Sequence, residues 1–306
     1  MNARRVLPAA LVGALMYATL VVVVALHGAL ILPAAILKLL LWPWPRLHRG
    51  CTAYSLWIAS HWGPINRAVG KALLGQQWTL NLPATLDPNR SYLVIANHRS
   101  WVDILLLFDG LSRRAPLPRF FLKYELLYVP LIGSACWAMD FPFMRRHSRE
   151  AVASNPALRL QDIETTRRAC AIYKTQPVSV INFVEGTRFT PEKHTETQSP
   201  YQHLLPPKTA GVAFALSAMG EQFGGVLDIT FGYRTSDKNI LWSWLCGEQG
   251  SLKVHTELLP IPADLLGGDY EADAEFRQRF KTWMNEIWAR KDARLQSWAG
   301  SETQNG

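Results

Sequence analysis

Paired cysteines and clustered metal ligands are absent from this sequence of 306 residues. The four cysteines lie far apart and form no Cys-x-x-Cys pair, so zinc-ligand and redox-dithiol sites have no support. We expect four reduced thiols in a reducing compartment. His194 and His203 stand in a polar stretch without a third ligand at suitable spacing, so no metal site is predicted. The chain also lacks a Gly-x-Ser-x-Gly turn, which argues against a serine hydrolase.

Charged residues are few, and acids are outnumbered by bases. Only 18% of the residues are charged, whereas about 25% is usual for a soluble protein. The formal net charge is +8 and the pI is about 9.4, a balance that suits nucleic acid, anionic lipid or an acidic substrate. No RRM, KH or helix-turn-helix signature appears, so we predict no nucleic-acid partner. The twelve tryptophans are typical of a surface that is apolar on one side and wet on the other.

One long N-terminal run lacks charge altogether. No Asp, Glu, Lys or Arg occurs from Val6 to Leu37, and Ala9–Leu32 alone supplies the roughly 20 apolar residues that span a bilayer. The run is longer than the apolar core of a signal peptide, and no clean Ala-x-Ala site closes it. A buried core helix is the alternative, although the run is too uniformly apolar for one buried face. Because Pro33 is expected to break the run, we predict a membrane-embedded helix or helical hairpin over residues 1–45.

The orientation of this segment stays open. Basic residues flank both of its ends, so the positive-inside rule does not choose between a span and a hairpin that re-enters one leaflet. These residues are Arg4, Arg5, Arg46, Arg49, Arg67 and Lys71.

Strand-like and helix-like segments alternate through the rest of the chain. This alternation predicts an α/β fold, with a mixed sheet flanked by helices, over residues 46–296. A frayed polar tail is expected at 297–306. The expected strands are Ser91–Ala96, Cys136–Phe141, Pro177–Val184, Val226–Tyr233 and Ser251–Leu259. The expected helices are Arg46–Leu80, Ser100–Leu111, Asp162–Lys174, Thr209–Met219 and Glu271–Leu295.

Two further stretches stand out by their composition. Residues 186–208 are polar and contain proline, and a loop of that length is usually functional or disordered. Leu126–Met139 is uncharged but too short to span a bilayer. It is interpreted as an interfacial segment or the wall of a lipid groove, with a buried core segment as the alternative.

The first candidate for chemistry is Asn97-His98-Arg99-Ser100-Trp101-Val102-Asp103, which follows a predicted strand and opens a predicted helix. If Ser100 is the N-cap, Asp103 falls at the third helical position and can return toward His98. An Asp that accepts from Nδ1–H leaves Nε2 free as a base. The alternative is a capping Asp beside a turn His, since this spacing alone is a weak signal. Arg99 either binds a phosphate or headgroup, or is merely exposed.

The second candidate is Phe183-Val184-Glu185-Gly186-Thr187-Arg188, where a predicted strand enters a loop. Gly186 lets the backbone approach an anion, Thr187 adds a hydroxyl donor, and Arg188 offers a bidentate fork for phosphate. An ordinary surface turn with a solvated Arg is the alternative.

Together these blocks resemble the lysophosphatidate (1-acylglycerol-phosphate) acyltransferase family, the PlsC-like group, and come closest to its bacterial YihG-like branch. The resemblance covers about residues 90–235 by motif, with Val184 in place of the usual Pro. The family's first block is matched by Asn97, His98, Ser100 and Asp103, and a later one by Phe183, Glu185, Gly186, Thr187 and Arg188. Two more blocks are matched by Lys123-Tyr124-Glu125-Leu126 with Pro130 and Gly133, and by residues 205–211, including Lys208, with 227–230.

The resemblance implies a fold, an activity and roles for these residues. The fold is an α/β domain with an N-terminal membrane-embedded helical motif. The activity moves a fatty acyl chain from a thioester donor to the free hydroxyl of 1-acyl-glycerol-3-phosphate, which gives phosphatidic acid. His98 is the general base and Asp103 steadies its imidazolium. Thr187, Arg188 and Lys123, with Gly186, bind the acceptor phosphate, and Glu185 orients these groups or the acceptor hydroxyl. The supporting residues are Asn97, Arg99, Ser100 and Lys208.

The implied partners are a lysophospholipid acceptor, acyl-CoA or acyl carrier protein as donor, and anionic membrane lipids. No cofactor is required. The implied location is the bacterial inner (cytoplasmic) membrane, with the active site facing the cytoplasm. Acceptors left open are another lysophospholipid or a lyso-aminolipid. The alternative from another class is a non-catalytic membrane adaptor on the same fold.

Overall fold

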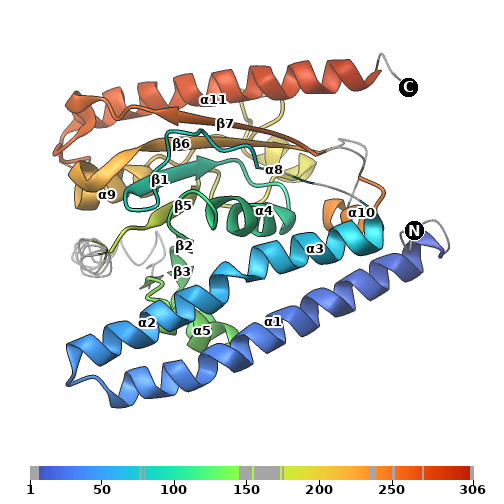
Figure 1. Ribbon diagram of the computed structural model, residues 1–306. Coiled ribbons are helices and arrows are strands. Elements are labelled where there is room, and N and C mark those ends of the chain that lie inside the picture. Colours follow the sequence, from blue (N-terminus) through green and yellow to red (C-terminus); the bar gives the residue numbers. More distant parts are fainter. Residues whose placement is uncertain are drawn as a thin grey trace.

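A mixed five-stranded sheet forms the centre of the computed structural model (Figure 1), in the order β2-β5-β1-β6-β7. β1 pairs in parallel with β5 and β6, β2 in parallel with β5, and β7 antiparallel with β6. The predicted α/β fold with a mixed sheet is thus confirmed. The strands are β1 Ser91–Ala96, β2 Pro118–Phe120, β5 Ser179–Phe183, β6 Phe223–Gly232 and β7 Lys253–Leu259, with a small sheet of β3 Leu122–Lys123 and β4 Phe143–Met144. The structure describes residues 7–75, 78, 80–144, 154, 173, 176–233, 239–249, 252–270 and 272–303.

Helices cover both faces of the sheet. All six residues of β1 are buried, because alternate side chains enter different cores. Leu93 and Ile95 pack with residues of α9 and α11, whereas Val94 and Ala96 pack with residues of α4. The remaining helices are α4 Val102–Leu111, α5 Ile132–Ala138, α8 Pro191–Glu196, α9 Ala210–Met219, α10 Ile240–Leu245 and α11 Ala274–Thr303, with 3-10 turns η2 Tyr124–Tyr128, η4 Gly220–Gln222 and η5 Ala263–Leu265.

The N-terminal segment forms a helical hairpin against this sheet domain. α1 (Ala9–Leu40) runs in one direction, and α2 (Pro45–Ser60) and α3 (Trp62–Leu74) return alongside it (Figure 1). The predicted break at Pro33 is wrong, because α1 continues through this proline to Leu40. The turn instead lies between α1 and α2. The single helix expected at Arg46–Leu80 is two helices, and α3 ends at Gly75 in the left-handed conformation that favours glycine.

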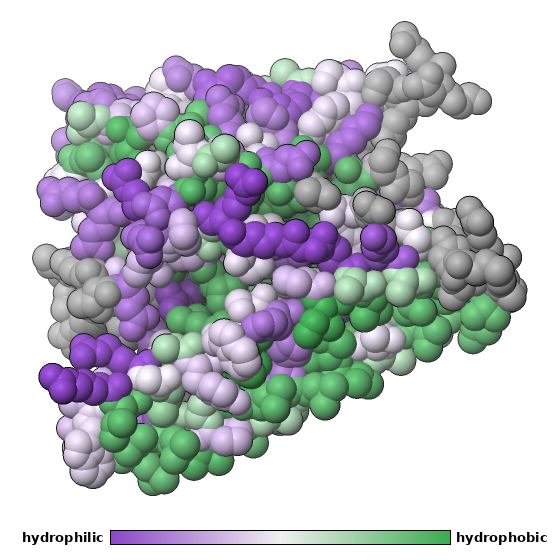
Figure 2. Space-filling model, viewed as in Figure 1, coloured by the Kyte–Doolittle hydropathy of each residue, from purple (hydrophilic) through white to green (hydrophobic). Residues whose placement is uncertain are grey.

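α1 leaves much of its apolar surface uncovered. It is long and apolar enough to cross a membrane, and Figure 2 shows a hydrophobic band along the edge of the molecule that α1 occupies. Exposed large side chains of α1 are Leu11, Leu15, Tyr17, Val21, Val22, Leu26, Leu30, Ile36, Leu37, Leu39 and Leu40. These residues form a surface that aqueous solvent does not favour.

Two local predictions fail because distant parts of the chain intervene. The strand expected at Cys136–Phe141 is mostly helix α5 and a turn with Asp140 at φ 60°. Lys38 of α1 donates hydrogen bonds to the carbonyls of Trp137 and Ala138 and to the Asp140 carboxylate, so tertiary contacts determine this segment.

At the other end of the chain, the tail expected to fray from 297 is helical as far as Thr303. Trp298 packs against Gly232 and its carbonyl accepts a hydrogen bond from Lys253. The helix expected at Asp162–Lys174 lies outside the described residues, apart from Tyr173.

Candidate functional site

His98 and Asp103 meet at the carboxyl end of β1. Asp103 Oδ2 lies 2.8 Å from His98 Nδ1 and also accepts hydrogen bonds from the backbone N–H groups of Arg99 and Ser100. α4 begins at Val102, so Asp103 is its second residue rather than its third. The Asp103 side chain is fully buried and that of His98 is 15% exposed. The carboxylate therefore caps the turn and orients the imidazole at once. In this orientation Nε2 is the ring nitrogen that Asp103 does not engage.

Tyr233 is a partner of this pair that the motifs did not indicate. Its hydroxyl donates to the second oxygen of Asp103, Oδ1, at 2.5 Å. The side-chain amide of Asn97 exchanges two hydrogen bonds with the backbone of Phe231 on β6. The sequence predicts Tyr233 only as the last residue of the strand Val226–Tyr233. The signal that could have found it is a tyrosine at the end of an apolar strand, since a buried hydroxyl needs a polar partner.

Glu185 lies behind the His98 turn and is 1% exposed. Its two oxygens accept hydrogen bonds from the backbone N–H groups of His98, at 2.8 Å, and Leu205, at 2.9 Å. Burial raises the pKa of Glu185 to about 7, although these hydrogen bonds and Arg99 oppose the rise. Glu185 thus joins the His98 turn to the loop at Leu205.

The loop after Glu185 is surrounded by positive charge. Gly186 has φ 70°, a conformation that favours glycine, and a Cβ atom there would lie 3.1 Å from Lys208 Nζ. Lys193 Nζ donates to Thr187 Oγ1 at 2.6 Å. The Arg188 guanidinium lies 5.6 Å from the centre of the Trp101 ring. Lys193 and Trp101 were not predicted as site residues, and Lys193 could have been found as a cation inside the long polar loop.

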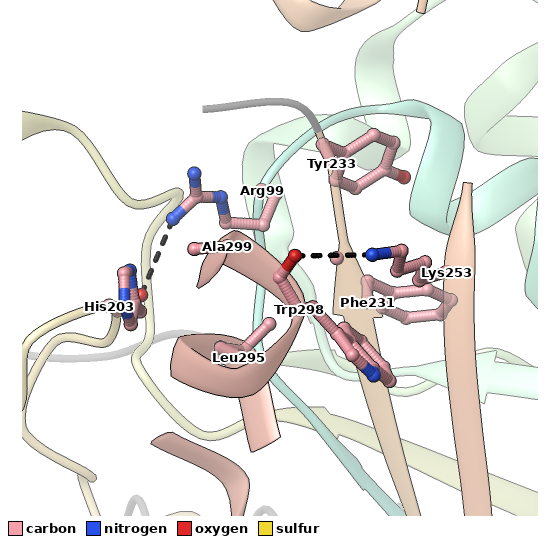
Figure 3. A pocket seen from close by; sticks show the side chains of 9 residues that line it. Arg99, His203, Phe231, Tyr233, Lys253, Leu295, Trp298 and Ala299 are labelled. Carbon is pink, nitrogen blue, oxygen red and sulfur yellow. Dashed lines mark hydrogen bonds between the residues drawn. The ribbon is translucent and has the colours of Figure 1, made fainter. Parts of the chain in front are cut away.

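Arg99 is half-buried and its guanidinium has partners within the protein, so it is not merely exposed. Its guanidinium lies 4.4 Å from the centre of the Phe189 ring and donates to the His203 carbonyl. Burial lowers its pKa, while Glu185 and Asp103 raise it. Figure 3 shows Arg99 beside Tyr233 in a small pocket, with its guanidinium turned toward His203.

Most of the predicted site residues come together, because β1 and β5 are parallel neighbours whose carboxyl ends lie at one edge of the sheet. Ser100 belongs to this group through its backbone N–H bond to Asp103. Lys123 differs: it is exposed on β3, in the small sheet. Among the described residues, no hydrogen bond or ion pair links Lys123 to the His98 turn or the Gly186–Arg188 loop.

The chain belongs to the Acyltransferase family, whose model matches residues 79–234, more than half of its length. Lysocardiolipin acyltransferase 1 of Mus musculus is 25% identical over 262 residues, which are 80% of this chain and 65% of that protein. The 1-acyl-sn-glycerol-3-phosphate acyltransferase gamma of Mus musculus is 27% identical over 214 residues, 66% of this chain and 51% of that one. The chain thus spans between about half and two thirds of the length of these relatives.

A solved structure shares the fold. The 1-acyl-sn-glycerophosphate acyltransferase PlsC from Thermotoga maritima aligns with a TM-score of 0.51 over 91% of this chain and 95% of its own, at 16% identity. The predicted PlsC-like architecture is therefore confirmed.

Proposed function

We propose that this protein is a membrane-bound O-acyltransferase that moves a fatty acyl chain from a thioester donor to the free hydroxyl of 1-acyl-glycerol-3-phosphate. The product is phosphatidic acid. The observation that carries the proposal is the contact between His98 Nδ1 and Asp103 Oδ2, placed at the same sheet edge as the cationic Gly186–Arg188 loop. A base with its orienting carboxylate, next to an anion-binding loop, suits a phosphate-bearing alcohol.

The proposed reaction needs no covalent enzyme intermediate. The acceptor hydroxyl donates a hydrogen bond to His98 Nε2, and its oxygen attacks the thioester carbonyl while the proton passes to Nε2. Asp103 stabilises the resulting imidazolium. When the tetrahedral intermediate collapses, the C–S bond breaks and the proton passes from His98 to the leaving sulfur. A thiol with a pKa of about 8.5 is a good leaving group, so little acid assistance is required.

The acceptor phosphate is proposed to bind at the Gly186–Arg188 loop. Arg188 supplies a two-pronged donor whose guanidinium lies over the Trp101 ring. Lys208 lies against Gly186 and Lys193 bonds Thr187, so two more cations flank the loop. Holding the phosphate places the hydroxyl at a defined distance from the base, which contributes to the rate. A role for Lys123 as a further phosphate ligand stays a prediction.

Membrane attachment is proposed for the hairpin of α1 and α2. The exposed apolar side of α1 continues into Trp42, Trp44 and Trp57, which are 76%, 55% and 60% exposed. Such aromatic side chains suit the headgroup level of a bilayer. Four finer points stay predictions: location in the bacterial inner membrane, a site that faces the cytoplasm, membership of the YihG-like branch, and contact with anionic lipids. The proposed donor is either acyl-CoA or acyl carrier protein. A requirement for no cofactor also stays a prediction.

A second acceptor class is favoured by one of the relatives. The similarity to a lysocardiolipin acyltransferase extends over 80% of this chain, which supports another lysophospholipid as the alternative acceptor. A lyso-aminolipid acceptor and a non-catalytic membrane adaptor on the same fold stay hypotheses from the sequence, and the experiment below distinguishes them.

The test is an acyl-transfer assay with the purified full-length protein in lipid nanodiscs. The acceptors are lysophosphatidate, lysocardiolipin, lysophosphatidylethanolamine and a lyso-aminolipid, each with acyl-CoA and with acyl carrier protein as donor. We expect lysophosphatidate to be preferred and His98→Ala to abolish transfer, while His255→Ala, a matched change on β7, retains it. Absence of transfer to every acceptor, or full activity of His98→Ala, would overturn the proposal.

A further inference from the structure

We infer that Tyr233 is a positioning residue for the His98–Asp103 pair: its hydroxyl holds the Asp103 carboxylate in the rotation that serves the base. This inference rests on the proposed function, because it concerns the same proton transfer. The Tyr233 side chain is buried and its hydroxyl is bonded to Asp103, so in this inference it acts through Asp103.

The two oxygens of Asp103 have unequal support. Oδ2 accepts hydrogen bonds from His98 Nδ1 and from the backbone N–H groups of Arg99 and Ser100. Oδ1 accepts from the Tyr233 hydroxyl, and in the part of the chain that the structure describes no other donor reaches it. Asp103 is fully buried, so loss of this bond would leave an anionic oxygen without a donor, which is a costly arrangement.

The position of Tyr233 follows from the pairing of β1 with β6. The ladder ends at Ala96 and Ile229, and the Asn97 side chain extends it by bonding both the N–H and the carbonyl of Phe231. Tyr233 lies two residues farther on and therefore faces the same side as Phe231, in the core that contains α4. Figure 3 shows both side chains projecting from this strand end. Asn97 thus aligns the strand that delivers Tyr233 to Asp103.

Tyr233 acts as a donor over the whole working pH range. Burial and the neighbouring Asp103 carboxylate raise the pKa of Tyr233 well above its ordinary value, and only Arg99 opposes this. The charged groups that act on Tyr233 are Asp103 and Arg99. Glu185 lies next to the His98–Asp103 pair, where it accepts from the His98 backbone N–H. A phenol that donates to Oδ1 withdraws negative charge from the carboxylate. Without this donor, Asp103 would stabilise the His98 imidazolium more strongly and would also be freer to rotate.

The experiment compares Tyr233→Phe with Tyr92→Phe in the full-length protein with lysophosphatidate and acyl-CoA. Tyr92 is a matched control: it is 2% exposed, and its hydroxyl accepts a hydrogen bond from Asp87 N–H at the opposite end of β1. For Tyr233→Phe we expect kcat to fall about tenfold or more, the worth of one hydrogen bond to a charged group. The KM for lysophosphatidate should stay unchanged, and the acid limb of the pH–rate profile should move to higher pH. Tyr92→Phe should change none of these.

Two results would overturn the inference while leaving the proposed function intact. One is a folded Tyr233→Phe protein with the wild-type kcat and pH profile. The other is a loss of kcat that Tyr92→Phe reproduces in equal measure, because this would indicate general destabilisation. If Tyr233→Phe does not fold, 3-fluorotyrosine at position 233 replaces it. This more acidic phenol donates more strongly and should move the acid limb to lower pH, whereas an unmoved limb would contradict the inference. If the proposed function itself is wrong, the wild-type protein will transfer no acyl chain to lysophosphatidate.

Discussion

Glu185 binds the backbone N–H of His98 at 2.8 Å although 87 positions separate the two residues. The Glu185 carboxylate also reaches the N–H of Leu205, so one buried side chain joins the proposed base to the loop that carries Lys208. The Glu185 carboxylate therefore fixes the positions of the His98 turn and the Leu205 loop. In the proposed function, Thr187 and Arg188 of the same motif bind the acceptor phosphate.

The pH dependence of stability should report this buried carboxyl. The pKa of Glu185 rises from 4.5 to about 7 on folding, so between these pH values the folded state binds more protons than the unfolded state. Its contribution to the free energy of unfolding therefore falls as pH rises through this window, by about 3 kcal/mol at most. Glu185→Gln should remove this pH dependence of the free energy of unfolding. The variant should be less stable than wild type at pH 4.5, because one acceptor oxygen is lost. The difference in stability between the two proteins should become smaller toward pH 8. Thermal unfolding followed by Trp fluorescence from pH 4.5 to 8 measures this.

The control for that measurement is Glu196→Gln, an exposed change on α8. Its unfolding curve should parallel that of wild type at every pH. If the Glu185→Gln and wild-type curves also run parallel, Glu185 does not titrate in this window.

Arg188→Ala should impair the acceptor selectively. Loss of a charge-assisted contact to phosphate costs about 1.5–3 kcal/mol, so we expect the KM for lysophosphatidate to rise about 10- to 100-fold with little change in the KM for acyl-CoA. Arg188→Lys should recover only part of the loss, because an ammonium group lacks the planar fork. Steady-state kinetics with each substrate varied in turn provide the measurement, and Arg90→Ala, an exposed change before β1, is the control. Equal loss for both substrates would contradict the phosphate role.

Lys38→Met should weaken the attachment of α1 to the segment that ends α5. Lys38 is 1% exposed and its ammonium bonds the Asp140 carboxylate at 2.5 Å. Removing one partner of a buried pair costs about 3–5 kcal/mol, so the melting temperature should drop by several degrees. The double variant Lys38→Met/Asp140→Asn should regain part of the loss, because Asn tolerates the positive φ of Asp140. Lys71→Met, an exposed change on α3, should melt like wild type; no difference between the two Lys variants would count against this role.

Truncation after Gln296 should destabilise the protein. Trp298 packs on Gly232, and its carbonyl accepts a hydrogen bond from Lys253. Trp298 is partly buried, so its loss should cost less than the roughly 3–5 kcal/mol of a fully buried Trp. The affected strand β6 leads to Tyr233, so activity should fall with the melting temperature. Removal of residues 302–306 alone is the control and should leave both unchanged. A stable, active protein ending at Gln296 would show that the last turns of α11 are dispensable.

The sequence pattern predicted those elements whose residues carry their own local signal. β1, β5 and β6 are mostly apolar runs near the expected places, and β7, although more polar, lies within the expected Ser251–Leu259. α4 and α9 follow from their helical character. The segment at Cys136–Phe141 failed because Lys38, about a hundred positions away, supplies hydrogen bonds that no local pattern contains. The helical end of α11 was missed for the same reason, since Trp298 finds its partner on β6.

Residue order alone determined the family, the sheet class, the long apolar helix and the proximity of His98 to Asp103, because each depends on a local motif, a composition or a spacing of a few residues. Tertiary structure decided the partners of that pair. Two such contacts are the hydrogen bonds from His98 N–H to Glu185 and from Tyr233 to the second Asp103 oxygen. They join strand ends and loops that are distant in sequence, and these segments meet only because of the order of the strands in the sheet. Hydrogen bonds act over about 3 Å, so their partners are known only when the sheet has brought distant residues to one edge.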